Sequence, residues 1–339
     1  MKVLVTGSNG FLGATLVRRL CERGETYVRC LHRPGSNLRR LAAVQADHPG
    51  AELDHCVGNL TSPEDCARAI DGVDLVYHGA AALTGAAADM FLNTVVASKN
   101  LLEAVRRSPR PARIVQVSSF GVYGMAGVEE GSVVTEDTPL EPHPELRDLY
   151  SQAKLRQEQL FWEYRERHQL PIAVVRPGVV YGPSGPAMSN RVGLRLFGLF
   201  LHLGRRNLLP LTYVDNCADA LVDVARSPES TGQVYNVVDD DLPTARAYLD
   251  AYRREVERLR VVSLPLFATL LLSRLVAWYH AHSRGQLPAI FTPYKTNSMW
   301  RSFRYDNSRL KSLGWRPRVS TAEGMRRTFE ALRAAAAAR

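Results

Sequence analysis

The sequence has few cysteines and no pair of them at metal-binding spacing. Its 339 residues contain five, at positions 21, 30, 56, 66 and 217, and no C-x-x-C pair. Zinc centres and disulfide frameworks rely on closely spaced cysteines, so we expect no metal site, no disulfides and a reducing compartment such as the cytoplasm. An apolar run already begins at residue 2, which leaves no room for a signal peptide and favours the same location.

The sequence also lacks a basic cluster. Its formal net charge is +9, and nearly all of the excess comes from scattered arginines. A nucleic-acid reader shows a basic stripe or a known binding module, and neither is visible here. We therefore expect a small-molecule substrate and no nucleic-acid partner, and we leave open a homodimer.

No apolar run is long enough to cross a membrane comfortably. The two most apolar stretches are residues 194–203 and 264–279, and the second carries Arg274 near its middle, where lipid would disfavour a charge. We interpret residues 264–279 as a buried helix. The alternatives are a hydrophobic substrate wall or a helix lying on a surface, which would give peripheral membrane contact through residues 264–284.

What the sequence does contain begins with a glycine-rich turn. Residues 2–6 form a short apolar strand, Gly7, Gly10 and Gly13 follow, and residues 11–23 show helical apolar spacing. Such a turn needs glycine for tight geometry and for close approach to a pyrophosphate, which then sits at the helix N-terminus. The spacing G-x-x-G-x-x-G departs from the commoner G-x-G-x-x-G, yet the order strand, glycines, helix predicts dinucleotide binding.

Strands and helices then alternate along the chain. This pattern predicts an α/β fold with a doubly wound parallel sheet of the Rossmann type and a smaller C-terminal substrate lobe. We expect residues 1–183 to bind the cofactor and hold the catalytic groups, residues 184–330 to form mainly the substrate lobe with some segments returning to the core, and residues 331–339 to be a frayed tail. The expected strands are 27–31, 51–56, 74–78, 113–118 and 172–176, and the expected helices are about 36–46, 63–71, 86–107 and 147–168.

Arg33 follows the second strand, where the residue type selects between the two nicotinamide cofactors. An acidic residue at this point binds a ribose 2′-hydroxyl, whereas an arginine suits a 2′-phosphate. No Asp or Glu stands there. We therefore favour NADP(H) over NAD(H), with a solvated loop arginine as the alternative.

Tyr150 and Lys154 are spaced i, i+4 and project from one face of a helix. A tyrosine with a pKa near 10 is a poor base at neutral pH, but an ammonium about 4 Å away could lower that pKa by roughly three units. A serine hydroxyl across the cleft could then hold a carbonyl oxygen. Taken alone, the same spacing also occurs by chance in exposed helical pairs.

Together, these motifs resemble the extended short-chain dehydrogenase/reductase superfamily, which includes NAD(P)-dependent epimerases, dehydratases and 3β-hydroxysteroid dehydrogenases. The resemblance runs over nearly the whole chain, through residues 6–13, 76–81, 118–124, 150–154 and 176–183 and through Asn93. It implies Tyr150 as acid/base, Lys154 as ribose ligand and pKa modulator, Ser119 as the hydroxyl that orients the carbonyl, and Asn93 as support for the site. It further implies cofactor contacts from Thr6, Gly7, Asn9, Gly10, Phe11, Leu12, Gly13, Arg33, Asn59, Leu60, Ala80, Ala81, Tyr150, Lys154, Pro177 and Val179. Substrate contacts are expected from Ser118, Ser119, Tyr123 and Tyr181. Ser118 is also the alternative to Ser119 as the hydroxyl that orients the carbonyl.

Two positions depart from the family's pattern. Val179 stands where nucleotide-sugar enzymes of the superfamily commonly carry an asparagine, and Asn59 replaces the usual aspartate near the adenine. Valine cannot supply the lost hydrogen bond, so we favour an oxidoreductase that interconverts a hydroxyl and a ketone on a lipophilic, sterol-like or acyl substrate. The alternatives are a nucleotide-sugar epimerase, dehydratase or ketosugar reductase, and a non-catalytic NADP-binding regulator.

Overall fold

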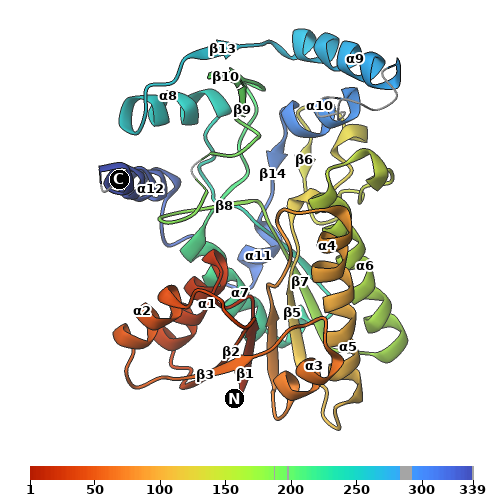
Figure 1. Ribbon diagram of the computed structural model, residues 1–339, viewed down its shortest axis with the longest axis vertical. Helices are drawn as coiled ribbons and strands as arrows, with labels where there is room; N and C mark the ends of the chain where they lie inside the picture. The colour runs from red at the N-terminus through yellow and green to blue at the C-terminus, as the bar shows by residue number, and fades with distance from the viewer. Residues whose placement is uncertain (187, 197, 283–291, 338–339) are drawn as a thin grey trace.

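The computed structural model describes the chain except residues 187, 197, 283–291 and 338–339. At its centre lies a seven-stranded parallel sheet in the order β12-β7-β5-β4-β1-β2-β3 (Figure 1). This order, which extends outward in both directions from β1 and β4, confirms the doubly wound Rossmann-type sheet predicted from the sequence. The strands are β1 (Val3–Thr6), β2 (Tyr27–His32), β3 (Glu52–Val57), β4 (Leu75–His78), β5 (Arg113–Val117), β7 (Ile172–Pro177) and β12 (Val234–Val237).

Helices cover both faces of this sheet. On one face α1, α2 and α7 pack over Val3 and Val5 of β1, and on the other α3, α5 and α6 pack over Leu4. Successive strand residues point to opposite faces, so an uninterrupted apolar strand fills two cores at once. The helices are α1 (Phe11–Glu22), α2 (Arg39–Asp47), α3 (Pro63–Ile70), α4 (Ala87–Phe91), α5 (Ala97–Arg107), α6 (Leu149–His168) and α7 (Val214–Arg226).

Between α4 and α5 the chain forms a π-helix, η1 (Leu92–Val96). The sequence predicted one helix over residues 86–107, and the structure has a continuous helical path in which the middle turn is wider than an α-turn. π-Turns of this kind occur mostly as single turns, often beside functional sites.

The second lobe is built mainly from the C-terminal half of the chain and lies above the sheet (Figure 1). Its small sheet has the order β13-β10-β9, while β12 and α7 from the same half of the chain belong to the main sheet and its covering layer. The lobe and its connections contain β9 (Gly193–Leu196), β10 (Leu199–His202), β13 (Val261–Ser263), α8 (Ala245–Glu255), α9 (Leu266–His282), α10 (Pro293–Trp300) and α12 (Thr321–Ala337). Shorter elements are β6 (Val133–Val134), β8 (Val179–Tyr181), β11 (Leu211–Tyr213), β14 (Arg304–Tyr305), α11 (Ser308–Ser312), η2 (Phe120–Val122), η3 (Met125–Gly127), η4 (Pro144–Leu146) and η5 (Pro228–Ser230).

One expectation about this half of the chain is corrected, and another stays a prediction. Residues 331–337 form the last part of α12, residues 338–339 lie outside the described residues, and the fraying of this end stays a prediction. The helix at residues 264–279 exists as α9, but it is not buried: Phe267 is 75% exposed and Trp278 60% exposed. Within the described residues, no helix has both the length and the apolar character needed to span a membrane.

Candidate active site

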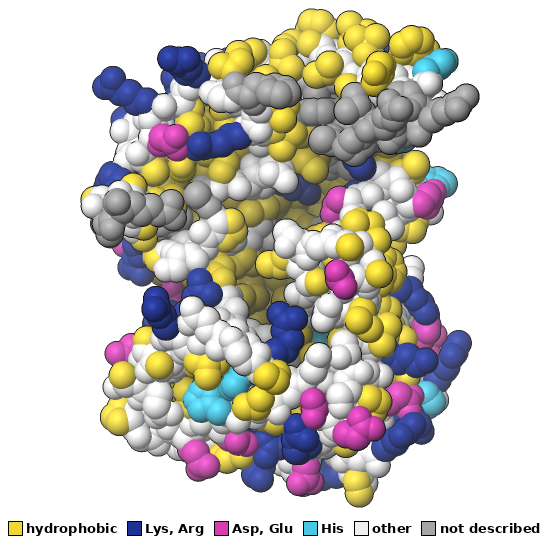
Figure 2. Space-filling model, viewed as in Figure 1, with side chains coloured by type: hydrophobic (Ala, Val, Ile, Leu, Met, Phe, Trp, Pro, Cys, Tyr) yellow, Lys and Arg dark blue, Asp and Glu magenta, His cyan; other side chains and the backbone are white. Residues whose placement is uncertain are grey.

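A cleft of about 790 Å³ opens at the carboxyl ends of the central strands. Gly7 follows β1, Arg33 follows β2, Gly79 follows β4, and Ser118 and Gly178 follow β5 and β7, and all of them line it. Ligands of doubly wound sheets bind at this edge, where the strand order reverses. Figure 2 shows the hollow between the two lobes on one face of the molecule.

The glycine turn forms one wall of the cleft. Gly7 has φ +71, a left-handed backbone that favours glycine, and its Cα faces the backbone of Ala80. A Cβ on Gly13 would lie 2.1 Å from the carbonyl oxygen of Gly7. Only glycine therefore lets α1 begin this close to β1, which leaves the N-terminus of α1 open to a phosphate.

Almost all of the expected cofactor contacts line this one cleft. Thr6 is the exception, because it is fully buried behind the glycine turn, where its hydroxyl lies 2.9 Å from Nδ1 of His78 and accepts a hydrogen bond from the amide of Ala80. The expected residues that do line the cleft are Gly7, Asn9, Gly10, Phe11, Leu12, Gly13, Arg33, Asn59, Leu60, Ala80, Ala81, Tyr150, Lys154, Pro177 and Val179.

The end of the cleft near β2 is basic and carries no acidic side chain. Arg33 is exposed beside Ser36, and Asp89 is the only acidic residue among the described residues that line the cleft. Asn59 also lies here, and its side-chain carbonyl accepts a hydrogen bond from the amide of Thr61 at 3.1 Å. One acceptor site of that amide is thus already used within the protein.

Ser119 follows β5 and Tyr150 lies at the start of α6, and their hydroxyls share a hydrogen bond in the cleft. Asp148 caps α6 by accepting a hydrogen bond from the amide of Ser151, which places Tyr150 in the first turn. Burial raises the pKa of Tyr150, a hydrogen bond with Ser119 lowers it, and the carboxylate of Asp148 raises it. Because both hydroxyls line the cleft, they can bind the same substrate oxygen.

Lys154 lies one turn further along α6, but its ammonium group bonds to the protein interior. It donates to the carbonyl of Val117 at 2.6 Å and to the side-chain carbonyl of Gln157. Burial lowers the pKa of Lys154 to about 7. Burial is the largest influence on the pKa of Tyr150, and the lowering of that pKa by Lys154 stays a prediction.

Behind Lys154 lies a buried chain of polar groups that sequence reasoning missed. Gln157 donates to Ser98 at 2.7 Å and lies 3.2 Å from Nε2 of His78, whose other nitrogen contacts Thr6. Burial, with a smaller effect of Lys154, lowers the pKa of His78 to about 3, so this imidazole is neutral. The chain links the end of β1 to the lysine; the only sequence signal was the position of Gln157, three residues after Lys154.

A second missed feature is the buried ion pair between Glu158 and Arg176. Both side chains are almost fully buried, and Glu158 also accepts a hydrogen bond from Ser118. Arg176 contacts the Tyr123 hydroxyl at 3.0 Å. Because its hydroxyl is held by Glu158, Ser118 is less available to a substrate than Ser119.

Asn93 lies on the π-turn and lines the cleft, with its amide donating to the carbonyl of Asp89 at 2.8 Å. Two expected substrate contacts do not reach the cleft. Tyr123 is fully buried and donates to Asn236 at 2.6 Å, and Tyr181 is 2% exposed and lies 3.3 Å from a carboxylate oxygen of Asp239. Both hydroxyls stabilise the core, so neither tyrosine is retained as a substrate contact.

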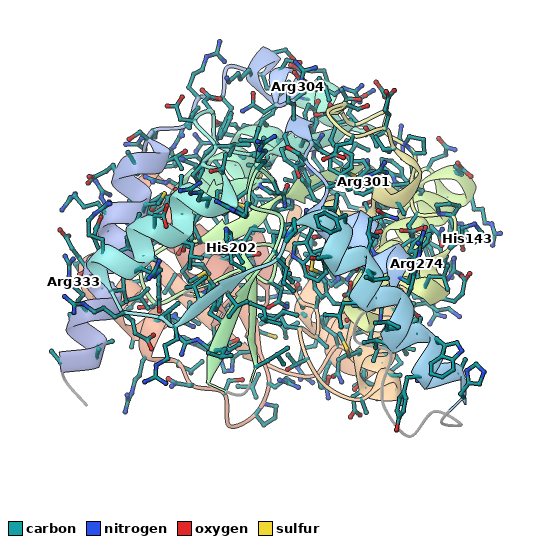
Figure 3. All side chains as sticks on the ribbon, turned by 90° about the horizontal axis from the view of Figure 1, so that it is seen from above. His143, His202, Arg274, Arg301, Arg304 and Arg333 are labelled. Carbon is teal, nitrogen blue, oxygen red and sulfur yellow. The ribbon has the colours of Figure 1, made fainter. Side chains whose placement is uncertain are left out.

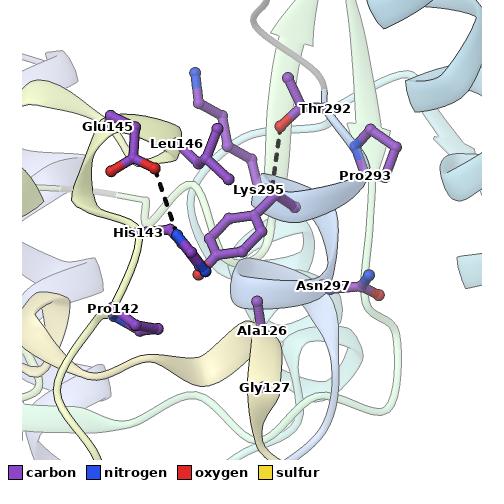
Figure 4. Close-up of a pocket in the computed structure, with 11 residues that line it drawn as sticks. Ala126, Gly127, Pro142, His143, Glu145, Leu146, Thr292, Pro293, Lys295 and Asn297 are labelled. Carbon is purple, nitrogen blue, oxygen red and sulfur yellow. Dashed lines mark hydrogen bonds and ion pairs between the residues drawn. The ribbon is translucent and has the colours of Figure 1, made fainter.

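A second cavity of about 770 Å³ lies between η3, the segment around η4 and the start of α10 (Figure 4). Ala126, Pro142, Leu146 and Pro293 give it apolar surface, and an ion pair of 3.5 Å joins His143 to Glu145. Lys295 is the only Lys or Arg among its described lining residues.

Comparison with known proteins connects this geometry to a family. The model of the family described as "NAD dependent epimerase/dehydratase family" matches residues 3–237. A 3-beta-hydroxysteroid dehydrogenase of Mycolicibacterium neoaurum is 26% identical over 349 residues, covering 96% of this chain and 89% of that protein. A UDP-glucose 4-epimerase of Mycolicibacterium smegmatis is 27% identical over 363 residues, covering 98% and 99%.

Among solved structures, the UDP-glucose 4-epimerase of Thermus thermophilus in complex with NAD has a TM-score of 0.70 and 24% identity, over 99% of this chain and 100% of that one. At this identity the likeness shows the fold alone. The family match is stronger evidence because it spans more than half of the chain. The protein therefore belongs to the NAD dependent epimerase/dehydratase family and is an NAD(P)-dependent enzyme of the extended short-chain dehydrogenase/reductase type.

Proposed function

We propose that the protein is an NADP(H)-dependent oxidoreductase that interconverts a hydroxyl and a ketone on a lipophilic substrate. The observation that carries this proposal is that Tyr150, Ser119 and Lys154 line the same cleft as the glycine turn. Residues 1–183 would bind the cofactor and carry the catalytic groups, and residues 184–330 would mainly bind the substrate.

When bound, a nicotinamide supplies or accepts the hydride. In the reductive direction, Tyr150 donates its phenolic proton to the oxygen of the former carbonyl, and in the oxidative direction it accepts the hydroxyl proton. Ser119 donates a hydrogen bond to the same oxygen and fixes its position. Lys154, whose ammonium donates to Val117 and Gln157, would hold the cofactor's ribose.

The preference for NADP(H) is supported by the charge of the cleft at the end of β2. A guanidinium group can bind a 2′-phosphate through two parallel hydrogen bonds, whereas NAD(H) offers only a hydroxyl there. Arg33 lines the cleft, and the described lining residues near it include no carboxylate that would bind a 2′-hydroxyl.

A lipophilic substrate is supported by Val179 and by the cavity beside α10. Val179 lines the cleft where an amide would bind a nucleotide sugar. A substrate diphosphate needs cationic partners when it is buried, and the second cavity offers Lys295 beside the acidic Glu145. The steroid dehydrogenase relative fits this substrate class.

The alternative is a nucleotide-sugar epimerase or ketosugar reductase, favoured by the epimerase relative that matches nearly the full chain. A non-catalytic NADP-binding regulator is disfavoured, because a sensor has no need of a serine, tyrosine and lysine gathered in its cofactor cleft.

A substrate panel tests the proposal. Purified enzyme is incubated with NADPH and either aliphatic and sterol-like ketones or UDP-sugars, and NADPH absorbance and sugar isomers are followed. Each buried CH₂ contributes about 0.8 kcal/mol, so kcat/KM should rise as an alkyl ketone is lengthened until the pocket is full. Turnover of a UDP-sugar, or tight competition by one, would replace this proposal with the epimerase alternative.

A further inference from the structure

Helix α9 exposes a row of large apolar side chains and buries two polar ones, Thr269 and Ser273. Its outward face carries Phe267, Leu271, Leu275, Trp278 and Tyr279, each at least half exposed. These positions follow the spacing i, i+4, i+8, i+11 and i+12, which places them on one side of a helix. We call this set of five residues the α9 ridge.

The opposite side of α9 holds the helix on the protein. Thr269 and Ser273 are buried there, and the Ser273 hydroxyl lies 2.5 Å from that of Thr296 in α10. Leu266 and Val276 pack beside them against the cluster around Trp300. The α9 ridge is therefore turned away from the core by specific contacts. Figure 2 shows hydrophobic side chains gathered along the edge where Figure 1 places α9.

The charge of the surrounding segment is of one sign. From residue 258 to residue 305 the sequence contains no Asp or Glu, whereas it contains seven basic residues. These are Arg258, Arg260, Arg274, Arg284, Lys295, Arg301 and Arg304. Figure 3 looks down on this face and labels Arg274 on α9. An apolar ridge set in a basic segment complements a surface that is apolar inside and anionic at its edge.

This complementarity distinguishes a membrane from a second copy of the chain. Two α9 ridges packed against each other would bring the Arg274 side chains of the two copies together, with no carboxylate from the same segment. A bilayer with anionic headgroups instead offers hydrocarbon to the ridge and phosphate to the arginines. Trp278 and Tyr279 lie at the end next to two histidines, as aromatic residues do at the level of headgroups.

We propose that the α9 ridge docks the protein on a bilayer that contains anionic lipids. The helix lies in the plane of the interface, with its apolar side chains inserted and the Arg274 side chain extended toward the headgroups. This inference rests on α9 and its charge, and it holds whichever substrate the cleft takes.

The test measures co-sedimentation of the full chain with phosphatidylcholine vesicles, with and without phosphatidylglycerol. We expect binding to the anionic vesicles at least tenfold stronger than to the neutral ones, and weakened by salt. Leu271→Gln/Leu275→Gln should reduce it at least tenfold. The matched control Leu92→Gln/Val133→Gln changes apolar side chains that are 44% and 43% exposed outside α9, and it should leave binding unchanged.

Two further measurements test the basic side chains and the insertion of the ridge separately. Arg258→Ala/Arg260→Ala should weaken binding to anionic vesicles alone, whereas Arg110→Ala, at a side chain that is 90% exposed elsewhere, should not. Lipids brominated in the acyl chains should quench tryptophan fluorescence in the wild type but not in Trp278→Phe. Absence of vesicle binding, or equal binding by the α9 double variant, would overturn the proposal. A dimer that the double variant dissociates, without vesicle binding, would assign the ridge to self-association.

Discussion

The wall of the cleft and the outer face of α9 distribute polar and apolar groups in opposite ways. Behind the cleft, charged and polar side chains such as Glu158, Arg176 and Gln157 are buried and paired with one another or with the backbone. On α9, leucines and aromatics are exposed, while Thr269 and Ser273 are buried. Buried polar networks hold side chains in fixed positions, whereas an exposed apolar patch is typical of a surface that meets a partner. The polar groups of the first region find their partners within the chain, and we propose that the second region finds its partner in a membrane.

The largest expected effect concerns Tyr150 in the cleft. Tyr150→Phe removes the proton that is transferred and should lower kcat by about 10²–10⁴-fold, while cofactor affinity stays unchanged. Steady-state kinetics and cofactor fluorescence titration measure the two quantities. Lys154→Met should lose both activity and cofactor affinity.

The control is Tyr164→Phe. Tyr164 lies on α6, as Tyr150 does, but away from the cleft, and its hydroxyl donates to Glu103 of α5. This variant should retain activity. A Tyr150→Phe enzyme with more than about a hundredth of the wild-type rate would contradict the acid/base role.

The buried ion pair gives the next largest effect. Glu158→Leu leaves Arg176 without its carboxylate in a site where both side chains are almost fully buried, so we expect a loss of about 3–5 kcal/mol in the free energy of unfolding. Glu158→Leu/Arg176→Met should recover much of that loss, because no unpaired charge remains. Urea unfolding measures both variants.

Glu330→Leu is the matched control, since its ion pair with Arg326 is about half exposed and such pairs contribute about 0–1 kcal/mol. If Glu158→Leu is as stable as the control, the interior is less dependent on this pair than its burial indicates.

Arg33→Ala tests the polar rim of the cleft. Losing charge-assisted hydrogen bonds of about 1.5–3 kcal/mol should weaken NADPH binding by roughly 10- to 100-fold and leave NADH binding unchanged. Fluorescence titration of both cofactors measures this, with Arg110→Ala as a control distant from the cleft. Equal wild-type affinities for the two cofactors, or an equal loss for both in the variant, would rule out the NADP(H) assignment.

The smallest effect on the free energy of unfolding is expected for a substitution on the exposed face of α9. It compares this face directly with the buried core. Leu271→Gln should change the free energy of unfolding by no more than about 0.5 kcal/mol, because that side chain is already 57% exposed. Leu101→Ala in α5, at a fully buried leucine, should cost about 2–5 kcal/mol. Thermal and urea unfolding compare the two. A large loss for Leu271→Gln would mean that the protein itself covers this face in solution.

The sequence predicted the features that depend on residues close to one another in the chain. The six strands of the sheet up to β7, the glycine turn and the i, i+4 pair of Tyr150 and Lys154 follow from periodicity and spacing, which depend on neighbouring residues. The strand β12 was not assigned, because its place at the sheet edge beside β7 is a pairing between distant segments.

What the sequence could not predict depended on tertiary contacts. Tyr123 and Tyr181 belong to motifs that resemble those of the family. In the core, however, their hydroxyls donate hydrogen bonds to Asn236 and Asp239, which lie far along the chain. Residues 264–279 are apolar enough to suggest burial, but the pairing of Ser273 with Thr296 decides which side of α9 faces inward. The chain from Thr6 through His78 to Gln157 joins three elements, so no local pattern reveals it.

The π-turn η1 has a consequence for how this fold can vary in length. In a regular α-helix, which advances by about 100° per residue, one extra residue turns everything before it by that angle relative to everything after it. A π-turn closes its hydrogen bonds at i→i+5 instead of i→i+4, so it takes up one extra residue in a wider turn and leaves the flanking helices in place. Here α5 is fixed against the sheet, and α4 carries Asp89 to the rim of the cleft. The segment Leu92–Val96 could therefore lose one residue, the change of one codon, and close into a regular helix without moving the rim of the cleft.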